Sequence, residues 1–228
     1  MAPSARCCCY GACRMWRMKG ALLAAVIVAA LPGCKIIKTP TAEEKAAAAA
    51  KDAFDPKARV DAIWQPQVVP YFEKKAGELK DVTQLATSSP DQAGEKYGNP
   101  HKQSSSPWTY AVKFTGTVIT ADTASRAATL DVDTNGDGKA DAKVQIGPAL
   151  RGTALRDTLD FVNFNEFKNQ IEWAQFGKAF NEKANAAFLA AVPRDGLVGK
   201  TVTVIGAYPL PGEGQPPLVT PSELTVGS

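Results

Sequence analysis

The feature that constrains the fold most is the order in which helical and strand-like spacings of apolar residues follow one another along the chain. Apolar residues recur at helical spacing up to about residue 97, and this pattern returns over 165–191. Between and after these stretches apolar and polar residues alternate in five segments, at 110–119, 126–132, 142–147, 200–210 and 222–226. A period of two indicates strands and a period near 3.6 indicates helices. The chain is therefore expected to be an α+β protein in which three strands, a helix and two strands follow an N-terminal helical part.

This order predicts an OB-like five-stranded antiparallel barrel with a long helix between strands 3 and 4. Residues 107–228 are assigned to the barrel domain, and 55–98 to a small helical N-terminal subdomain that packs with it as one body or two. Asp55 followed by Pro56 indicates a helix start, and Pro66 and Pro70 are expected to break the next stretch into short helices. Asn165 is expected to cap the long helix.

The N-terminal residues have the pattern of a targeting segment. Arg14, Arg17 and Lys19 precede an apolar run at 21–31, which is shorter than the roughly 20 residues that a bilayer span requires. The run ends in LPGC at 31–34, which resembles the lipobox of bacterial lipoproteins. Residues 1–33 are therefore predicted to be a signal peptide and Cys34 to carry a lipid anchor. A plain secretory signal with a chance cysteine is the alternative.

Residues 34–54 would then hold the lipidated Cys34, a tether and an Ala-rich segment that is either a helix or a spacer. Removal of the signal peptide also changes the charge balance. The chain has 26 basic and 23 acidic residues, but four basic residues and no acidic one precede Cys34, which leaves 22 against 23. A near-neutral mature chain argues against nucleic acid as a partner.

Few side chains suited to catalysis remain after Cys34. All five cysteines lie at or before that position, so no thiol remains for a disulfide, a metal or a nucleophile. His101, the one histidine, lies in a polar segment and is interpreted as a surface residue. Paired carboxylates would be the alternative, drawn from Asp157, Asp160, Glu166 and Glu172. The sequence thus predicts a protein that is not an enzyme.

The segment DTNGDGKAD at 133–141 matches the first part of a calcium loop. Oxygen ligands would come from Asp133, Asn135, Asp137, the Lys139 carbonyl and Asp141, but the acid expected at the twelfth position is Val144. Any calcium site would therefore be weak and structural. The alternative is a hairpin turn without metal, because Asn-Gly at 135–136 favours a tight turn between strands.

A polar cluster follows the third strand. Guanidinium, carboxylate and amide groups there suit sugar hydroxyls or the polar backbone of a partner, and they belong to Arg151, Arg156, Asp157, Asn169 and Gln170. The alternative is a structural network in which Arg156 and Asp157 bond to neighbouring side chains and fix the strand-to-helix connection.

Four segments together resemble a domain-of-unknown-function family of predicted periplasmic lipoproteins: IGPALRGTALRD at 146–157, NQIEWAQF at 169–176, DPKARVDAIW at 55–64, and Tyr97-Gly98. The resemblance implies a periplasm-facing protein anchored by lipid to the cell membrane or the outer membrane. Members are often encoded beside sugar ABC transporters, which implies transporter components or a sugar-like ligand as partners. We therefore expect a binding or adaptor module, with a purely structural envelope protein and a hydrolase as alternatives.

Overall fold

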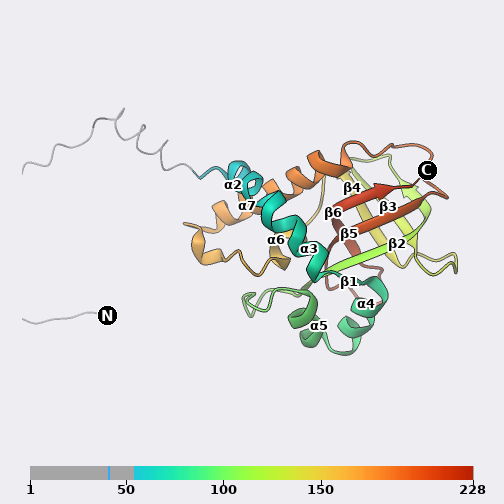
Figure 1. The fold of residues 1–228 in the computed structure, drawn as a ribbon, viewed down its shortest axis with the longest axis horizontal. Helices are drawn as coiled ribbons and strands as arrows, with labels where there is room; N and C mark the ends of the chain where they lie inside the picture. The colour runs from blue at the N-terminus through green and yellow to red at the C-terminus, as the bar shows by residue number, and fades with distance from the viewer. Residues whose placement is uncertain (1–40, 42–53, 228) are drawn as a thin grey trace, which may run out of the picture. The chain divides into compact units, whose positions relative to one another are not determined.

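Five β-strands form a closed barrel (Figure 1). The computed structural model describes residues 41 and 54–227. The barrel strands are β2 (Thr109–Asp122), β3 (Ala127–Asp133), β4 (Ala142–Pro148), β5 (Thr201–Pro209) and β6 (Leu218–Val226). Each of them overlaps one of the five alternating segments, so the strand prediction is confirmed. A two-residue strand, β1 (Gly77–Glu78), pairs in parallel with β2 and was missed because it is too short to show a period.

The strand order around the barrel is β2-β3-β4-β6-β5, and the pairing of β2 with β5 closes it. Four of the five pairings are antiparallel, whereas β4 and β6 pair in parallel through Lys143↔Leu218 and Val144↔Val219. The barrel is therefore mixed and not wholly antiparallel as predicted. The reason is parity, because strands that alternate in direction around a closed ring must be even in number.

The two faces of β2 contribute to two hydrophobic cores. Tyr110, Val112 and Phe114 face the barrel interior, where they pack with residues such as Leu130 and Val144. Successive side chains of a strand point to opposite faces. Ala111 accordingly lies in a second core outside the barrel, with Ala207 of β5 and side chains of the helices. The barrel is thus filled inside and covered by helices along one side.

The N-terminal helical part consists of α2 (Pro56–Ile63), a π-helical turn η1 (Trp64–Val68), α3 (Val69–Lys75), α4 (Leu79–Ser88) and α5 (Pro90–Tyr97). Asp55 caps α2 as predicted, accepting a hydrogen bond from the Ala58 N–H at 3.0 Å. The stretch consists of short helical pieces as predicted, but Pro66 and Pro70 leave no gap between them, because η1 joins α2 to α3 without interruption. The Val69 N–H donates to the Trp64 carbonyl five residues earlier, and this wider turn accommodates the prolines.

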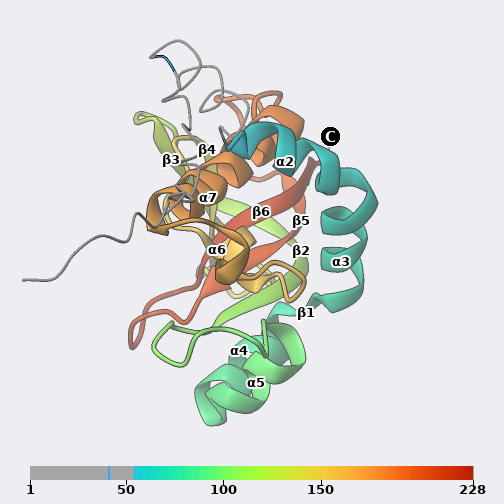
Figure 2. The ribbon, with the colours of Figure 1, turned by 90° about the vertical axis from the view of Figure 1, so that its left-hand side faces the viewer.

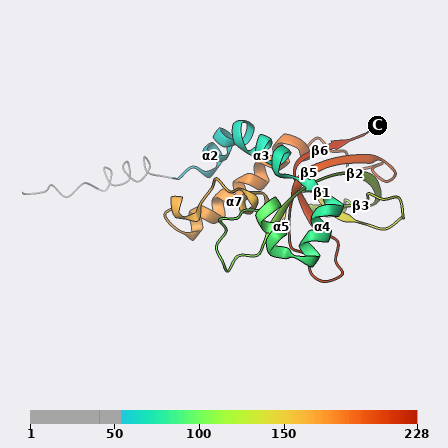
Figure 3. The same cartoon turned by 60° about the horizontal axis from the view of Figure 1, so that its bottom comes forward.

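These helices pack in two groups. Val60, Trp64 and Phe72 of the first group join the outer core with Phe176 and Phe180, and α2 lies beside α7 (Gln170–Ala184) in Figures 1 and 2. The second group, α4 and α5, contacts β2, and Figure 3 shows it in front of the strands. The residues from Phe54 onward belong to one compact unit, so the helices and the barrel pack as one body.

The long helix α7 starts later than the expected residue 165, but the connection between strands 3 and 4 is helical as predicted. This connection contains α6 (Ala154–Thr158), the 3-10 turn η2 (Phe164–Glu166), α7 and a π-helical turn η3 (Asn185–Leu189). Asn165 does not cap the long helix. Asn163 caps η2 and Asn169 caps α7. Leu189 at the end of η3 enters the barrel core, which is the plugging role that the fold assigns to this connection.

Among residues 41 and 54–227, no helix is both long and apolar enough to cross a bilayer. The signal peptide, Cys34 and the Ala-rich segment lie outside the described residues, apart from Thr41 and Phe54.

Candidate functional site

A groove runs along the outer face of β3 and β4 and has a volume of about 450 Å³. Its floor carries Thr129, Lys143 and Gln145, which alternate with the core residues Leu130 and Val144. Because the core residues face inward, their neighbours must face outward. We call this hollow the barrel-face groove. Its walls are the β2–β3 turn, Arg151, and the proline-rich segment between β5 and β6, through Asp122, Ser125, Ala127, Pro209, Pro211, Gly212, Gln215, Pro216 and Leu218.

Gln145 fixes the position of Arg151 at the edge of the groove. The Arg151 N–H donates to Gln145 Oε1 at 2.7 Å, and Gln145 Nε2 donates to the Arg151 carbonyl at 3.1 Å and to Thr220 Oγ1 at 2.7 Å. These bonds hold only the backbone of Arg151, whose side chain is exposed. Gly152 follows with φ of +77°, a left-handed conformation that glycine adopts without steric cost, and it turns the chain away from the groove.

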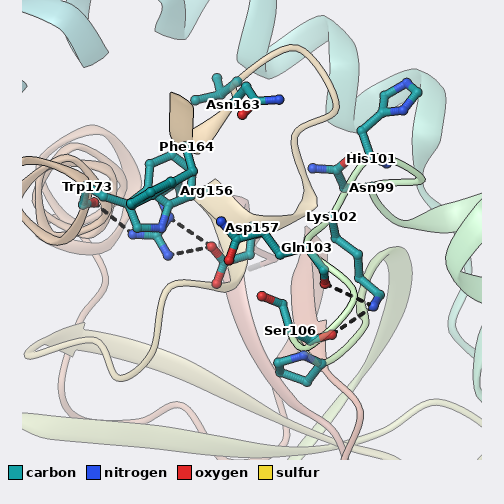
Figure 4. A pocket seen from close by; sticks show the side chains of 12 residues that line it. Asn99, His101, Lys102, Gln103, Ser106, Arg156, Asp157, Asn163, Phe164 and Trp173 are labelled. Carbon is teal, nitrogen blue, oxygen red and sulfur yellow. Dashed lines mark hydrogen bonds and ion pairs between the residues drawn. The ribbon is translucent and has the colours of Figure 1, made fainter. Parts of the chain in front are cut away.

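A second, smaller hollow of about 140 Å³ lies between the 99–107 segment, α6 and the start of α7 (Figure 4). We call it the Arg156 pocket. Its lining residues are Asn99, His101, Lys102, Gln103, Ser106, Pro107, Arg156, Asp157, Val162, Asn163, Phe164 and Trp173. Figure 4 shows Arg156 and Trp173 on one side of this pocket and Lys102 on the other.

Arg156 is only 6% exposed and is held by three kinds of contact. Its Nε and Nη2 donate to Asp157 Oδ1 at 2.8 and 2.5 Å, and its Nη1 donates to the Trp173 carbonyl at 2.8 Å. The guanidinium carbon lies 3.9 Å from the centre of the Trp173 ring, a cation–π contact. Thr153 donates its hydroxyl to Asp157 Oδ2 at 2.5 Å. These contacts form the network that the sequence offered as the structural alternative, and they link α6 to α7.

The five predicted binding residues do not form one surface. Arg156 and Asp157 line the Arg156 pocket, whereas Arg151 lines the groove. Asn169 accepts hydrogen bonds from the N–H groups of Ile171 and Glu172 at 2.9 and 3.0 Å and thus caps α7. Gln170 is exposed and lines neither hollow.

Sequence reasoning missed several residues that line these hollows. Lys143 and Gln145 could have been found, since the alternation that predicts β4 also predicts which of its side chains face outward. Lys102 and Trp173 could not, because their approach to Arg156 depends on tertiary packing of the 99–107 segment and α7.

The 133–141 loop bonds its oxygen-bearing side chains to its own backbone. Asp133 accepts bonds from the N–H groups of Asn135, Gly136 and Gly138 at 3.0, 2.7 and 2.8 Å. Asp141 accepts bonds from the backbone and hydroxyl of Thr134 at 2.8 and 2.7 Å. Strand pairing stops at Val132↔Ala142, so this loop is longer than the two-residue turn that Asn-Gly would form.

The backbone donors, with Gly138 contributing most, hold the pKa of the Asp133 carboxyl below its usual value. Among the described residues, no group of three or more His, Cys, Asp or Glu side chains is arranged to hold a metal ion. A melting temperature that rises in millimolar calcium, with the rise lost in Asp133→Ala and Asp137→Ala, stays a prediction.

The four carboxylates of the hydrolase alternative each have different surroundings. Asp157 bonds to Arg156, Glu166 pairs with Arg59, and Glu172 accepts a bond from the Lys168 N–H at 2.9 Å. Asp160 lies in a different hollow, beside Tyr71 and Lys96. Neither the groove nor the Arg156 pocket contains two of the four.

A family model described as predicted periplasmic lipoprotein (DUF2291) matches residues 24–225. The chain belongs to this family. The match confirms the resemblance seen in the sequence, and the family is described as predicted periplasmic lipoproteins, without an assigned activity.

The crystal structure of an OB-fold protein from Thermotoga maritima has a similar fold, with a TM-score of 0.60 and 17% sequence identity. The similarity covers 77% of this lipoprotein and 99% of the Thermotoga chain. At this identity the likeness shows the fold alone, and it confirms the OB-like barrel. A search of curated proteins gives no match.

Proposed function

We propose that this lipoprotein is a non-catalytic binding module and that its barrel-face groove takes a sugar-like ligand. The side chains that line the groove carry the proposal, and the size of the groove is compatible with it. Small-molecule sites have volumes of about 300–1,000 Å³. The groove, at about 450 Å³, lies in that range, whereas the Arg156 pocket, at about 140 Å³, is too small for a sugar ring.

The chemistry of the groove also suits a polyhydroxylated ligand. Arg151, Lys143 and Gln215 offer donors, and Asp122 offers an acceptor. Three proline rings, of Pro209, Pro211 and Pro216, provide stiff apolar surface against which the C–H face of a sugar can pack. Alternating donors and apolar surface are what a molecule with hydroxyls on its rim and C–H groups on its faces requires.

The groove lies where OB barrels generally bind their ligands. OB barrels bind oligosaccharides and oligonucleotides on the face of their second and third strands and on the flanking loops. Here those strands are β3 and β4, and the flanking loops are the β2–β3 turn and the β5–β6 segment. Fold alone does not establish function, so the side chains of the groove remain the main support.

The proposal includes a role in solute uptake. The sequence resemblance implies sugar ABC-transporter genes as frequent neighbours, and a module held at the periplasmic side by lipid on Cys34 would stand where such transporters collect their substrates. The ligand would then be the transported sugar, or the module would contact a transporter component directly as an adaptor.

The test is calorimetry of the mature lipoprotein in detergent against a panel of mono- and oligosaccharides. An Arg151→Ala, Gln215→Ala double variant should bind a hit at least tenfold more weakly, because it loses polar contacts worth about 1.5 kcal/mol or more. Its fold should be unaffected, since the backbone of Arg151 makes the structural bonds. Gln170→Ala is the matched control.

Affinity capture with the same proteins, followed by mass spectrometry, tests the transporter partner. If the double variant is folded and recovers the same sugars and partners as the wild type, the groove is not the binding site. If the wild type binds no sugar and captures no transporter component, a purely structural envelope role replaces the proposal.

A further inference from the structure

We propose that the Arg156 pocket is a second ligand site and that it binds a small oxyanion, a carboxylate or a phosphate. This site is separate from the barrel-face groove and does not depend on the function proposed for it. The inference rests on three observations: unused donors on a buried arginine, an uncompensated lysine opposite, and a preformed small cavity.

Arg156 retains donor capacity after its internal bonds are made. A guanidinium has five N–H groups. Three hydrogen bonds, two to Asp157 and one to the Trp173 carbonyl, leave two N–H groups without a partner among the described residues. The side chain is 6% exposed and lines the pocket, so an acceptor that enters the pocket would find donors there.

The charge of the pocket favours an anion. The charge of Asp157 is balanced by Arg156, and its second carboxylate oxygen accepts a hydrogen bond from the Thr153 hydroxyl. Lys102 lies on the opposite wall, and within the described residues its ammonium group contacts the carbonyls of Gln103 and Ser106 and the ring of Trp108, but no carboxylate. The lining residues therefore carry a net charge of about one positive unit when His101 is neutral.

The pocket is held open by bonds between its walls. Asn99 donates to the Leu159 carbonyl at 2.8 Å and accepts from the His101 N–H at 2.8 Å, which ties the 99–107 segment to the connection after α6. Phe164 contacts Trp173 edge-on, with their ring centres 5.9 Å apart. A hollow of about 140 Å³ with these fixed walls has room for an ion of a few heavy atoms.

The experiment titrates the mature lipoprotein in detergent with inorganic phosphate and, separately, with acetate, at ionic strength held constant with chloride. The readouts are calorimetry and the NMR signals of the Trp173 indole N–H and the Arg156 Nε–H. We expect saturable binding at one site and shifts of both signals. Binding of phosphate alone or acetate alone identifies the oxyanion, and either result supports the site.

Two variants and one control make the result decisive. Lys102→Ala and Arg156→Lys should each weaken binding about tenfold or more, because each removes a charge-assisted or forked donor. Lys178→Ala removes the same charge from an exposed position on α7 and should leave the affinity unchanged. Should Arg156→Lys not fold, Lys102→Ala decides alone. The proposal is overturned if neither ion binds saturably, or if folded Lys102→Ala binds both as the wild type does.

Discussion

At the scale of single residues, Gly177 shows how tightly the two sides of the Arg156 network meet. A Cβ atom at this position of α7 would lie 2.8 Å from Arg156 Nη1 and 2.8 Å from Thr153 Cγ2. The guanidinium cannot retreat freely, because it is bonded to Asp157 and to the Trp173 carbonyl. Glycine is therefore required here by space and not by backbone conformation.

Gly177→Ala is expected to lower the free energy of unfolding. Overpacking costs about 1–3 kcal/mol, which outweighs the gain of about 1 kcal/mol that alanine usually gives in a helix. Chemical denaturation measures the difference. Ala174→Gly, at an exposed position of the same helix, calibrates the propensity term. If Gly177→Ala were more stable than the wild type, Arg156 and Thr153 would have moved aside without a loss of free energy.

Asp133 makes a pH-dependent contribution. Its pKa is lowered in the folded protein, so its carboxylate stabilises the fold above the ordinary value of 3.8, and this stability is lost as the pH falls through the lowered value. Asp133→Asn should therefore be less stable than the wild type at neutral pH, and the gap should shrink below about pH 4. Thermal melts across pH 3–7 check this. A gap that does not change with pH would contradict it.

At the scale of elements, Asn169 and Gln170 separate a structural role from a binding role. Asn169→Ala should cost about 1 kcal/mol, because two N–H groups at the start of α7 lose their acceptor. Gln170→Ala should change stability by less than about 0.5 kcal/mol. Urea denaturation distinguishes the two variants. Equal stability of Asn169→Ala and the wild type would mean that the helix end finds another cap.

The elements that the sequence predicted well are those whose period is set by burial on one face. β6 starts at Leu218, earlier than the predicted residue 222, and it contains Pro221, a residue that is unusual in a strand interior. The strand tolerates Pro221 where the register to β5 shifts between Ile205 and Gly206. Ile171 is apolar but does not lie on the buried face of α7 and is 68% exposed. It lies nine residues from Phe180, about half a turn away around the helix.

The binding residues were predicted less well than the elements. Only four residues lie between Arg151 and Arg156, but one of them is Gly152, whose left-handed conformation turns the chain. Proximity in sequence was taken for a common surface. Only the packed chain shows that one arginine belongs to the barrel and the other to the helical layer.

At the scale of the whole molecule, we predict that attachment to the membrane depends on Cys34. Cys34→Ala should lose metabolic labelling by a palmitate analogue and should leave the membrane fraction. Twenty residues separate Cys34 from Phe54, so the folded part can stand at most about 70 Å from the anchor. Label retained by Cys34→Ala would contradict the assignment, and Lys35→Ala is a suitable control with the cysteine intact.

The odd number of barrel strands, which forces one pair to be parallel, has a consequence for how the barrel opens. Its one parallel contact joins β4 and β6 through two residue pairs, whereas β2 and β5 share nine. Thermal opening of the barrel should therefore begin at this seam, where the fewest hydrogen bonds must break together. Lys143 and Leu218, which form one of the two pairs, also line the barrel-face groove. A ligand bound in the groove would contact both β4 and β6 and would slow their separation. Ligand binding would therefore make β6 more rigid, although the ligand contacts this strand only at its first residue.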